Sequence, residues 1–252
     1  LAPFPELIPA CEAVSAIIAA GIVPAALEMM DQLITQALEE AYRFGFPLDA
    51  GAVLIVELDG LANGVEQQAR QVDEICRQNK ASEVRLAKDN AERAALWKCR
   101  KRAFGAIGRL RPNYVTQDGV VPRGKLPESM RFIRTVSERH DLRIPNVFHA
   151  GDGNIHPLIL YDERDPDQVK RALQAGDDIL GKCIELGGSV TGEHGIGAEK
   201  IDFMSRQFTT EDLDAMKQLR LVFDPKKQCN PHKMFPGAKR CAEFALKKQV
   251  PA

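Results

Sequence analysis

Two spacings of apolar residues alternate along this chain and predict helices interleaved with strands. Apolar residues three and four positions apart predict amphipathic helices, whereas short apolar or alternating runs predict strands. By these criteria, helices are expected over 11–20, 31–43, 63–80, 90–107, 127–140, 165–186, 199–206 and 210–223. Strands are expected over 52–58, 82–87, 115–121, 146–150 and 155–161. Residues 224–236 are rich in Pro, Lys and Asn and are expected to be irregular.

The order of these elements predicts an α+β fold. Residues 146–150 and 155–161 are separated by a short Gly-rich turn, which joins antiparallel strands rather than parallel ones. An α+β or mixed sheet, rather than a strictly parallel one, is therefore expected. The 252 residues contain no internal repeat or low-complexity linker, and this length suits one large domain or two small ones.

Composition and charge exclude several kinds of partner. The 34 basic and 35 acidic residues give a formal net charge of −1, which does not suggest binding to nucleic acid. No apolar run approaches the roughly 20 residues that cross a bilayer.

The six cysteines are scattered without a C-x-x-C pair, so reduced thiols in a cytoplasmic protein are expected. The start at Leu1 has no Met and no basic flank, and we expect a piece of a longer protein without a signal peptide.

Candidate chemistry is concentrated in the short hairpin. His149 and His156 bracket a turn of Gly, Asp, Gly and Asn. With 151–154 as the loop, Ala150 would face Ile155 across the two strands. His149 would then face His156, with Cβ atoms about 4.5–5.5 Å apart on one face of the sheet. Two imidazoles at that separation can bind one divalent metal ion.

A second glycine-rich loop, residues 187–197, brings a carboxylate and a third imidazole. Glu193 is the expected third metal ligand, because the glycines around it let the backbone approach an ion closely. His194 would then be free to act as a base, provided that the loop is irregular, since neighbours on a regular strand point to opposite faces. Zinc, manganese and iron all accept such ligands. A metal-dependent hydrolase and a non-catalytic binding module, whose loops only contact a partner, remain alternatives at this point.

Three motifs together indicate a family. They are HAGDGNIHP at 149–157, GEHGIG at 192–197 and FDPKKQCNP at 223–231. In this order and spacing they resemble the C-terminal half of the FAD-linked oxidases of the vanillyl-alcohol oxidase superfamily. Within it, the chain is most similar to the group that includes the glycolate oxidase D subunit and the D-lactate dehydrogenases. Similar stretches at 21–31 and 57–60 extend the resemblance over nearly the whole chain.

The resemblance implies an antiparallel, ferredoxin-like sheet covered by helices. A substrate or cap region would occupy about 1–200, and a helical segment of about 201–252 would return to the flavin. The FAD-binding domain that normally precedes this region is absent from the 252 residues. FAD would therefore be bound mainly outside this chain, which is expected to be inactive by itself.

Carried over by position, the resemblance assigns roles to the histidines and the glutamate. His149, His156 and Glu193 would bind the divalent metal, which would be zinc, manganese or iron. His194 would take the hydroxyl proton of a D-2-hydroxy acid while a hydride moves to the flavin. The activity implied is the oxidation of a CH–OH group to a 2-oxo acid.

The resemblance also places the substrate and flavin contacts. Arg100 falls where relatives pair an arginine with the substrate carboxylate, a bidentate task that suits a guanidinium. The alternative is that Arg100 is a surface cation among several others on the same helix. Asn230 would lie near the flavin. Phe104 and Thr116 replace a threonine and a lysine that relatives acting on longer dicarboxylates carry, which favours glycolate or D-lactate as the substrate.

The partners implied by the resemblance are a small 2-hydroxy acid and further subunits. An iron–sulfur subunit would be one of them, as expected for a glycolate oxidase. A cytoplasmic protein would then reach the periphery of the inner membrane through its partner subunits. An oligomer is compatible with the same resemblance.

Overall fold

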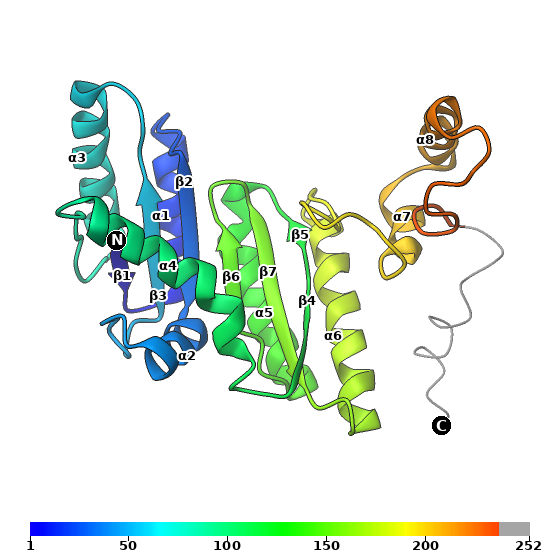
Figure 1. Ribbon diagram of the computed structural model, residues 1–252, viewed down its shortest axis with the longest axis horizontal. Coiled ribbons are helices and arrows are strands. Elements are labelled where there is room, and N and C mark those ends of the chain that lie inside the picture. Colours follow the sequence, from blue (N-terminus) through cyan, green and yellow to red (C-terminus); the bar gives the residue numbers. More distant parts are fainter. Residues whose placement is uncertain (237–252) are drawn as a thin grey trace.

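A computed structural model describes residues 1–236, and its strands form one antiparallel sheet (Figure 1). The strands are β1 (Ala2–Phe4), β2 (Ala26–Asp31), β3 (Ala52–Glu57), β4 (Asn113–Thr116), β5 (Gly119–Val120), β6 (Asn146–His149) and β7 (Asn154–Tyr161). Their order across the sheet is β1-β3-β2-β6-β7-β4, and β5 pairs with β7. All of these pairings are antiparallel, which confirms the predicted fold class.

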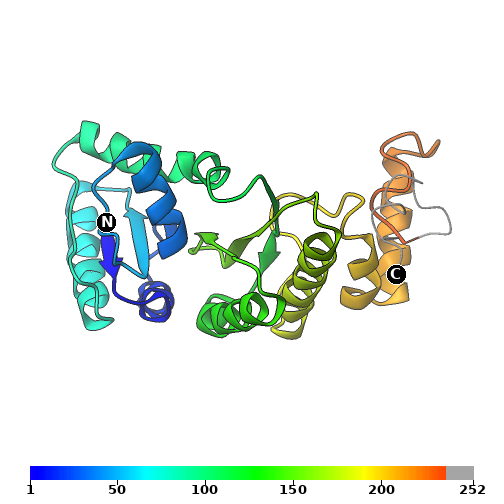
Figure 2. The same cartoon turned by 90° about the horizontal axis from the view of Figure 1, so that it is seen from below.

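Helices cover both faces of the sheet (Figure 2). The helices are α1 (Leu7–Ala19), α2 (Gln32–Tyr42), α3 (Ala62–Gln78), α4 (Asn90–Ile107), α5 (Leu126–His140), α6 (Pro166–Glu185), α7 (Ile201–Gln207) and α8 (Thr210–Phe223), with a 3-10 turn η1 (Arg123–Lys125) before α5. One face is covered by α1, α5 and α6, and the other by α2 and α4. The sequence therefore needs apolar side chains on both sides of its central strands.

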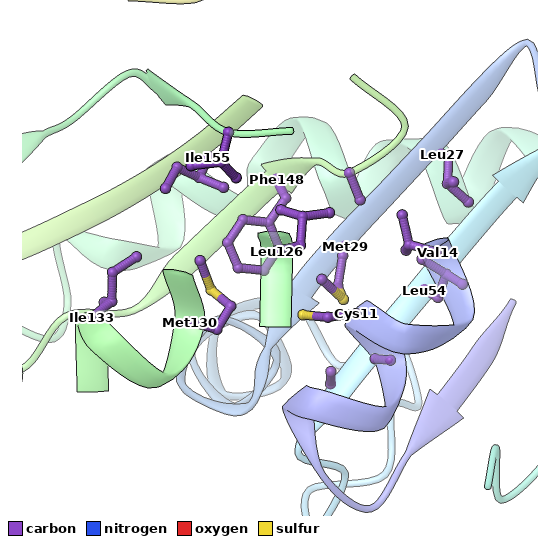
Figure 3. Packing of buried hydrophobic residues seen from close by; sticks show 14 of the residues in the cluster. Cys11, Val14, Leu27, Met29, Leu54, Leu126, Met130, Ile133, Phe148 and Ile155 are labelled. Atoms are coloured by element: carbon purple, nitrogen blue, oxygen red, sulfur yellow. The ribbon is translucent and has the colours of Figure 1, made fainter. Parts of the chain in front are cut away.

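The alternation of side chains along each strand fills these two cores. Met29 and Phe148 point toward α1 and α5, where Cys11 and Met130 complete the packing (Figure 3). Met30, the next residue on β2, belongs to the core under α2 and α4. Successive side chains of a strand point to opposite faces, so consecutive residues of β2 pack into opposite cores.

The same alternation places three polar side chains on the α4 side of the sheet. Glu28 shares this face with Met30, and His156 shares it with Leu158, a member of the α4-side core. His149 is the register partner of Glu28 on the neighbouring strand. Beneath α4, one edge of an otherwise apolar core is therefore polar.

The register of the hairpin differs from the predicted one. His149 pairs with Asn154, and His156 pairs with Val147, so the turn lies one residue earlier than 151–154. The two histidines are diagonal neighbours rather than directly opposite residues. Diagonal neighbours still share a face and lie within reach of long side chains.

Packing around Gly153 explains this register. Its φ of 73° lies in the left-handed region that glycine adopts at low cost. A β-carbon there would lie 2.1 Å from the carbonyl oxygen of Val121, whose own N–H donates to Gly153 O at 3.0 Å. The strand that follows Asp118 thus fixes Gly153 as the last residue of the turn, and Asn154 begins β7.

Two predicted strands are altered. Residues 82–87 form no strand, although Ser82 N and Arg85 N donate to the carbonyl oxygens of Pro3 and Leu1 at 2.9 and 2.8 Å. This segment runs beside β1 without a regular ladder, so the predicted strand was wrong. The predicted strand 115–121 is divided into β4 and β5 by Gln117 and Asp118.

The C-terminal part follows the prediction where the structure describes it. Helices α7 and α8 extend beyond α6 (Figure 1), and residues 224–236 contain only turns and bends. The expected flavin-side segment 201–252 is described only up to residue 236, and 237–252 lie outside the described residues. Over the described part of the chain, no helix has both the length and the apolarity required to span a bilayer.

Asp31 connects β2 with α2 and β6. Its Oδ1 accepts a hydrogen bond from Ile34 N at 3.1 Å and caps α2. Its Oδ2 accepts from the backbone N and the Nδ2 of Asn146, at 2.7 and 2.9 Å. Burial raises the pKa of Asp31 to about 6, against the opposing effect of the Asn146 hydrogen bonds.

We expect Asp31→Asn to flatten the pH dependence of unfolding between pH 4 and 6. The folded-state pKa of about 6 exceeds the ordinary 3.8, so the folded state holds this proton more tightly. This contribution to stability is complete below the lower pKa and is lost as the pH rises through the higher one. A shift of about two units corresponds to about 3 kcal/mol. Urea unfolding of both proteins across this range measures it, and identical slopes would contradict the expectation.

Candidate metal and substrate site

The three predicted metal ligands meet where β6, β7 and the second glycine-rich loop converge. The Nε2 atoms of His149 and His156 lie 3.4 and 3.1 Å from Oε1 of Glu193. The two imidazole centroids are 5.3 Å apart. One potential ligand atom from each of the three residues lies within 4.8 Å of the others. The set offers two imidazoles and one carboxylate around a common point, which suits a divalent metal.

The two imidazoles experience different surroundings. The hydrogen bond from His149 Nδ1 to the Glu28 carboxylate, at 2.7 Å, raises the pKa of His149. Burial lowers the pKa of His156, whose side chain is 1% exposed. The neutral imidazole is the form that binds a metal, so the burial of His156 favours its use as a ligand.

A second group of possible ligands shares His156. Asp118, His156 and His194 also bring potential ligand atoms within 4.8 Å of one another. The Asp118 carboxylate, however, is buried and already accepts hydrogen bonds from several donors. The Glu193 carboxylate is 53% exposed, and a metal would not have to displace such donors from it. The group of His149, His156 and Glu193 therefore fits a metal better.

Asp118 organises the loop that carries Glu193. Its Oδ2 accepts from Thr191 Oγ1 at 2.6 Å and from the backbone N of Gly192 and of His194 at 3.0 Å. Lys200 Nζ lies 3.3 Å from the same oxygen. Although burial would raise the pKa of Asp118, these hydrogen bonds and the ammonium hold it well below its usual range. Sequence reasoning missed Asp118; the only local signal was an acidic residue within a predicted strand.

Gly192 brings the loop against β7. A β-carbon at this position would lie 2.5 Å from Nδ2 of Asn154, a buried side chain. The backbone therefore approaches Asn154 more closely than any other residue type allows. This contact places Glu193, the next residue, beside the two histidines.

We expect Gly192→Ala to destabilise the protein by about 1–3 kcal/mol, because the added methyl overpacks the contact with Asn154. Metal affinity should fall with it, because Glu193 is displaced. Thermal unfolding and metal titration measure the two effects. In the matched background Asn154→Ala, the same glycine substitution should cost much less, since the space is then free. Equal costs in both backgrounds would show that the contact is not responsible.

His194 lies over one of the proposed ligands. Its ring stacks on that of His156 with centroids 5.2 Å apart and an interplanar angle of 10°. Its Nε2 is 3.7 Å from Glu193 Oε1, and about half of its side chain is exposed. The irregular loop therefore brings two consecutive side chains to one site, as the sequence interpretation required.

Arg100 is buried and adjoins the same cluster. Only 7% of it is exposed, so it is not the surface cation that the sequence left as an alternative. Its Nε donates to Glu28 Oε2 at 2.8 Å, while its Nη2 is buried and has no hydrogen-bond partner among residues 1–236. A buried donor without a partner is costly, and an anionic ligand would satisfy it.

Glu28 is the residue that sequence reasoning missed most clearly. It joins Arg100 of α4 to His149 of β6 through its two carboxylate oxygens. Its only sequence signal was a carboxylate within the apolar stretch 26–30, which was not predicted as a strand.

The remaining predicted residues lie at different places. The ring of Phe104 contacts that of His156 edge-on, with centroids 6.3 Å apart. Thr116 pairs with Leu158 in the ladder between β4 and β7. The carbonyl of Asn230, in the segment after α8, accepts a hydrogen bond from Arg220 at 3.3 Å. Within residues 1–236, no hydrogen bond or ion pair links Asn230 to the histidine cluster, and its predicted role stays a prediction.

Comparisons with known proteins agree with the resemblance. Residues 1–234 match the family model described as FAD linked oxidases, C-terminal domain. The chain is 46% identical over 244 residues to the glycolate oxidase subunit GlcD of Escherichia coli strain K12, covering 97% of this chain and 49% of that protein. It is 30% identical over 234 residues to a probable mitochondrial D-lactate dehydrogenase of Danio rerio, covering 92% and 46%. The chain thus spans about half the length of these curated relatives.

A solved structure shows the same fold at low sequence identity. The p-cresol methylhydroxylase structure with bound substrate is 13% identical and has a TM-score of 0.63, covering 88% of this chain and 50% of that one. At this identity the likeness concerns the fold alone. The family assignment rests on the match over residues 1–234 and on the sequence relatives. This chain therefore belongs to the family of FAD-linked oxidase C-terminal domains.

Proposed function

We propose that this chain is the substrate- and metal-binding part of an FAD-dependent 2-hydroxy-acid oxidoreductase. The observation that carries the proposal is a buried, incompletely paired Arg100 that Glu28 links to His149 of the two-histidine, one-glutamate cluster. A guanidinium beside a metal site suits a substrate that has a carboxylate next to a hydroxyl. Similarity to a glycolate oxidase subunit and to a D-lactate dehydrogenase supports this class of substrate.

His149, His156 and Glu193 would hold the divalent metal. When bound, such a metal lowers the pKa of a coordinated hydroxyl and fixes its orientation. The burial of His156 and the hydrogen bond on His149 Nδ1 leave both Nε2 atoms facing the Glu193 carboxylate. Zinc, manganese and iron all bind imidazole and carboxylate ligands. These three residues therefore do not determine which of the metals is bound.

His194 would act as the base, and Arg100 would bind the substrate carboxylate. The ring of His194, half exposed and stacked on His156, can take the hydroxyl proton at Nε2. Nη2 of Arg100 would donate to the carboxylate and thereby gain its missing partner. FAD, bound mainly by a preceding domain, would accept the hydride from C2.

A short monocarboxylate is the proposed substrate. Phe104 lies against His156, so this side of the histidine cluster presents an apolar ring rather than a polar partner for a second carboxylate. Thr116 pairs with Leu158 in the ladder, and its side chain carries no charge that could pair with a second carboxylate. Glycolate and D-lactate meet these conditions, because each has one carboxylate.

The assembly follows from the same proposal. We assign residues 1–200 to the substrate region and the segment from 201 onward, including Asn230, to the flavin side. The name glycolate oxidase subunit, carried by a relative, supports additional subunits. An iron–sulfur subunit and attachment to the periphery of the inner membrane through such partners belong to the proposal.

Flavin reduction in the natural full-length protein tests the function. Glycolate or D-lactate should reduce the flavin, and removal of metal by a chelator should prevent this. Arg100→Lys should raise KM by about 10- to 150-fold, because a charged hydrogen bond contributes about 1.5–3 kcal/mol. Short carboxylates without a 2-hydroxyl serve as controls and should not reduce the flavin. Absence of flavin reduction, with metal-dependent hydrolysis instead, would favour the hydrolase alternative and contradict the proposal.

A further inference from the structure

The Glu28 carboxylate occupies an unusual position between two elements of the site. It lies on β2, directly opposite His149 in the ladder with β6, and its side chain is 9% exposed. Oε1 is 2.7 Å from His149 Nδ1, and Oε2 is 2.8 Å from Arg100 Nε. Each carboxylate oxygen thus contacts a different residue of the proposed site.

An ionised carboxylate meets both demands because it only accepts hydrogen bonds. Arg100 can only donate, so Oε2 must accept from its Nε. Oε1, as an acceptor, requires that His149 carry a proton on Nδ1. In the neutral ring, which is the form that binds a metal, this leaves the lone pair of Nε2 free. That lone pair lies on the side of the ring facing Glu193, 3.4 Å away.

We infer that Glu28 is a positioning residue that holds His149 in the metal-binding tautomer and fixes the Arg100 guanidinium beside it. The inference rests on the proposed roles of His149 as a metal ligand and of Arg100 as a substrate-binding residue. It adds a residue, Glu28, that would contact neither the metal nor the substrate. Partners of this kind tune metal affinity by orienting the ligand ring. Glu28 would therefore couple the metal half of the site to its carboxylate half.

Charge supports the same assignment. The proposed site would contain Arg100 and a divalent metal as positive groups, and Glu28 and Glu193 as negative groups, while His149 and His156 would be neutral because metal binding requires it. The sum is a single positive charge, which matches one monoanionic 2-hydroxy acid. Without the negative charge of Glu28, the guanidinium would be buried beside the metal with no counter-ion, which is costly.

The substitution Glu28→Gln tests the inference because it keeps the shape but offers one acceptor and one donor. If the amide oxygen accepts from Arg100, the amide N–H faces His149 Nδ1 and favours the tautomer protonated on Nε2. We expect affinity for Zn²⁺, titrated into the metal-free full-length protein, to fall by about 10- to 100-fold. The ¹⁵N shifts of His149 in selectively labelled, metal-free protein should report the change of tautomer.

Glu57→Gln is the matched control. Glu57 lies on the neighbouring strand β3 and pairs with Arg93 of the same helix α4 at 3.0 Å, but in a more exposed position. Its substitution should leave Zn²⁺ affinity and the His149 tautomer unchanged. If the single variant Glu28→Gln does not fold, the double variant Glu28→Gln/Arg100→Met is compared with the single variant Arg100→Met. Neither of these two proteins contains the buried cation that Glu28→Gln would leave unpaired.

The outcomes separate this inference from the proposed function. Unaltered protein that binds no Zn²⁺ would overturn the metal site and, with it, the role of Glu28. Normal Zn²⁺ binding by the unaltered protein, combined with unchanged affinity or an unchanged His149 tautomer in Glu28→Gln, would overturn only the role of Glu28. Weaker binding together with the change of tautomer supports it, since a general loss of stability would not shift the proton between ring nitrogens.

Discussion

Replacing Glu193 with glutamine should abolish stoichiometric metal binding and lower hydroxy-acid oxidation by about 10³-fold or more. Glu193 supplies the only carboxylate of the favoured ligand group, at 3.1 and 3.4 Å from the two imidazoles. A neutral amide oxygen cannot replace the charge that holds a divalent ion there. The loss of several kcal/mol of transition-state stabilisation that a metal contributes corresponds to a rate effect of this size.

Metal content after gel filtration and flavin reduction in stopped flow measure the two effects. Glu199→Gln, an exposed acidic residue six positions along the same segment, is the control and should behave like the unaltered protein. Retained metal binding in Glu193→Gln would assign the ion to the competing group of Asp118, His156 and His194. That outcome would contradict the ligand assignment proposed here.

Removal of the Asp118 carboxylate should unfold the loop that carries Glu193 and His194. Asp118→Ala leaves Thr191 and three consecutive backbone N–H groups without their acceptor. It also leaves the buried Lys200 ammonium without its counter-ion. Breaking a buried ion pair from one side costs about 3–5 kcal/mol, and metal affinity should fall as well because the ligand loses its support.

Denaturant unfolding combined with Zn²⁺ titration measures this effect. Asp118→Asn keeps one acceptor oxygen and should fall between the unaltered protein and Asp118→Ala. Adding Lys200→Met to Asp118→Ala removes the unpaired charge and should recover part of the stability, but not the metal affinity. If the free energy of unfolding of Asp118→Ala were within about 1 kcal/mol of that of the unaltered protein, the Asp118 carboxylate would not be the group that holds the loop.

The helices show how much local pattern alone can predict. The spacing of apolar residues predicted a helix over 90–107, and α4 has those bounds. Its start is fixed locally, because the Asp89 side chain accepts a hydrogen bond from Glu92 N at 2.8 Å. Caps and periodicity involve residues within one or two turns, so they can be recognised without knowledge of the fold.

Strand β2 shows the opposite case. It is a central strand, yet it was missed because Glu28 interrupts its apolar residues and Asp31 ends it. Glu28 forms a hydrogen bond with Arg100, which is 72 positions away in the sequence. Asp31 forms hydrogen bonds with Asn146, at a separation of 115 positions. Partners at such separations leave no local signal, so a strand with buried acids does not resemble a strand in the sequence.

By itself, the sequence determined the antiparallel α+β class, the family, and the convergence of His149, His156 and Glu193. The fold class depends on hydrophobic periodicity, and the family and the site depend on short motifs. The two histidines remain neighbours in every hairpin register that keeps both on one face of the sheet. Only the tertiary structure decided the diagonal register of the hairpin, the burial of Arg100 and the parts of Glu28 and Asp118. The reason is physical: each of these is set by contacts between distant segments, where close packing and the pairing of buried charges leave a single arrangement.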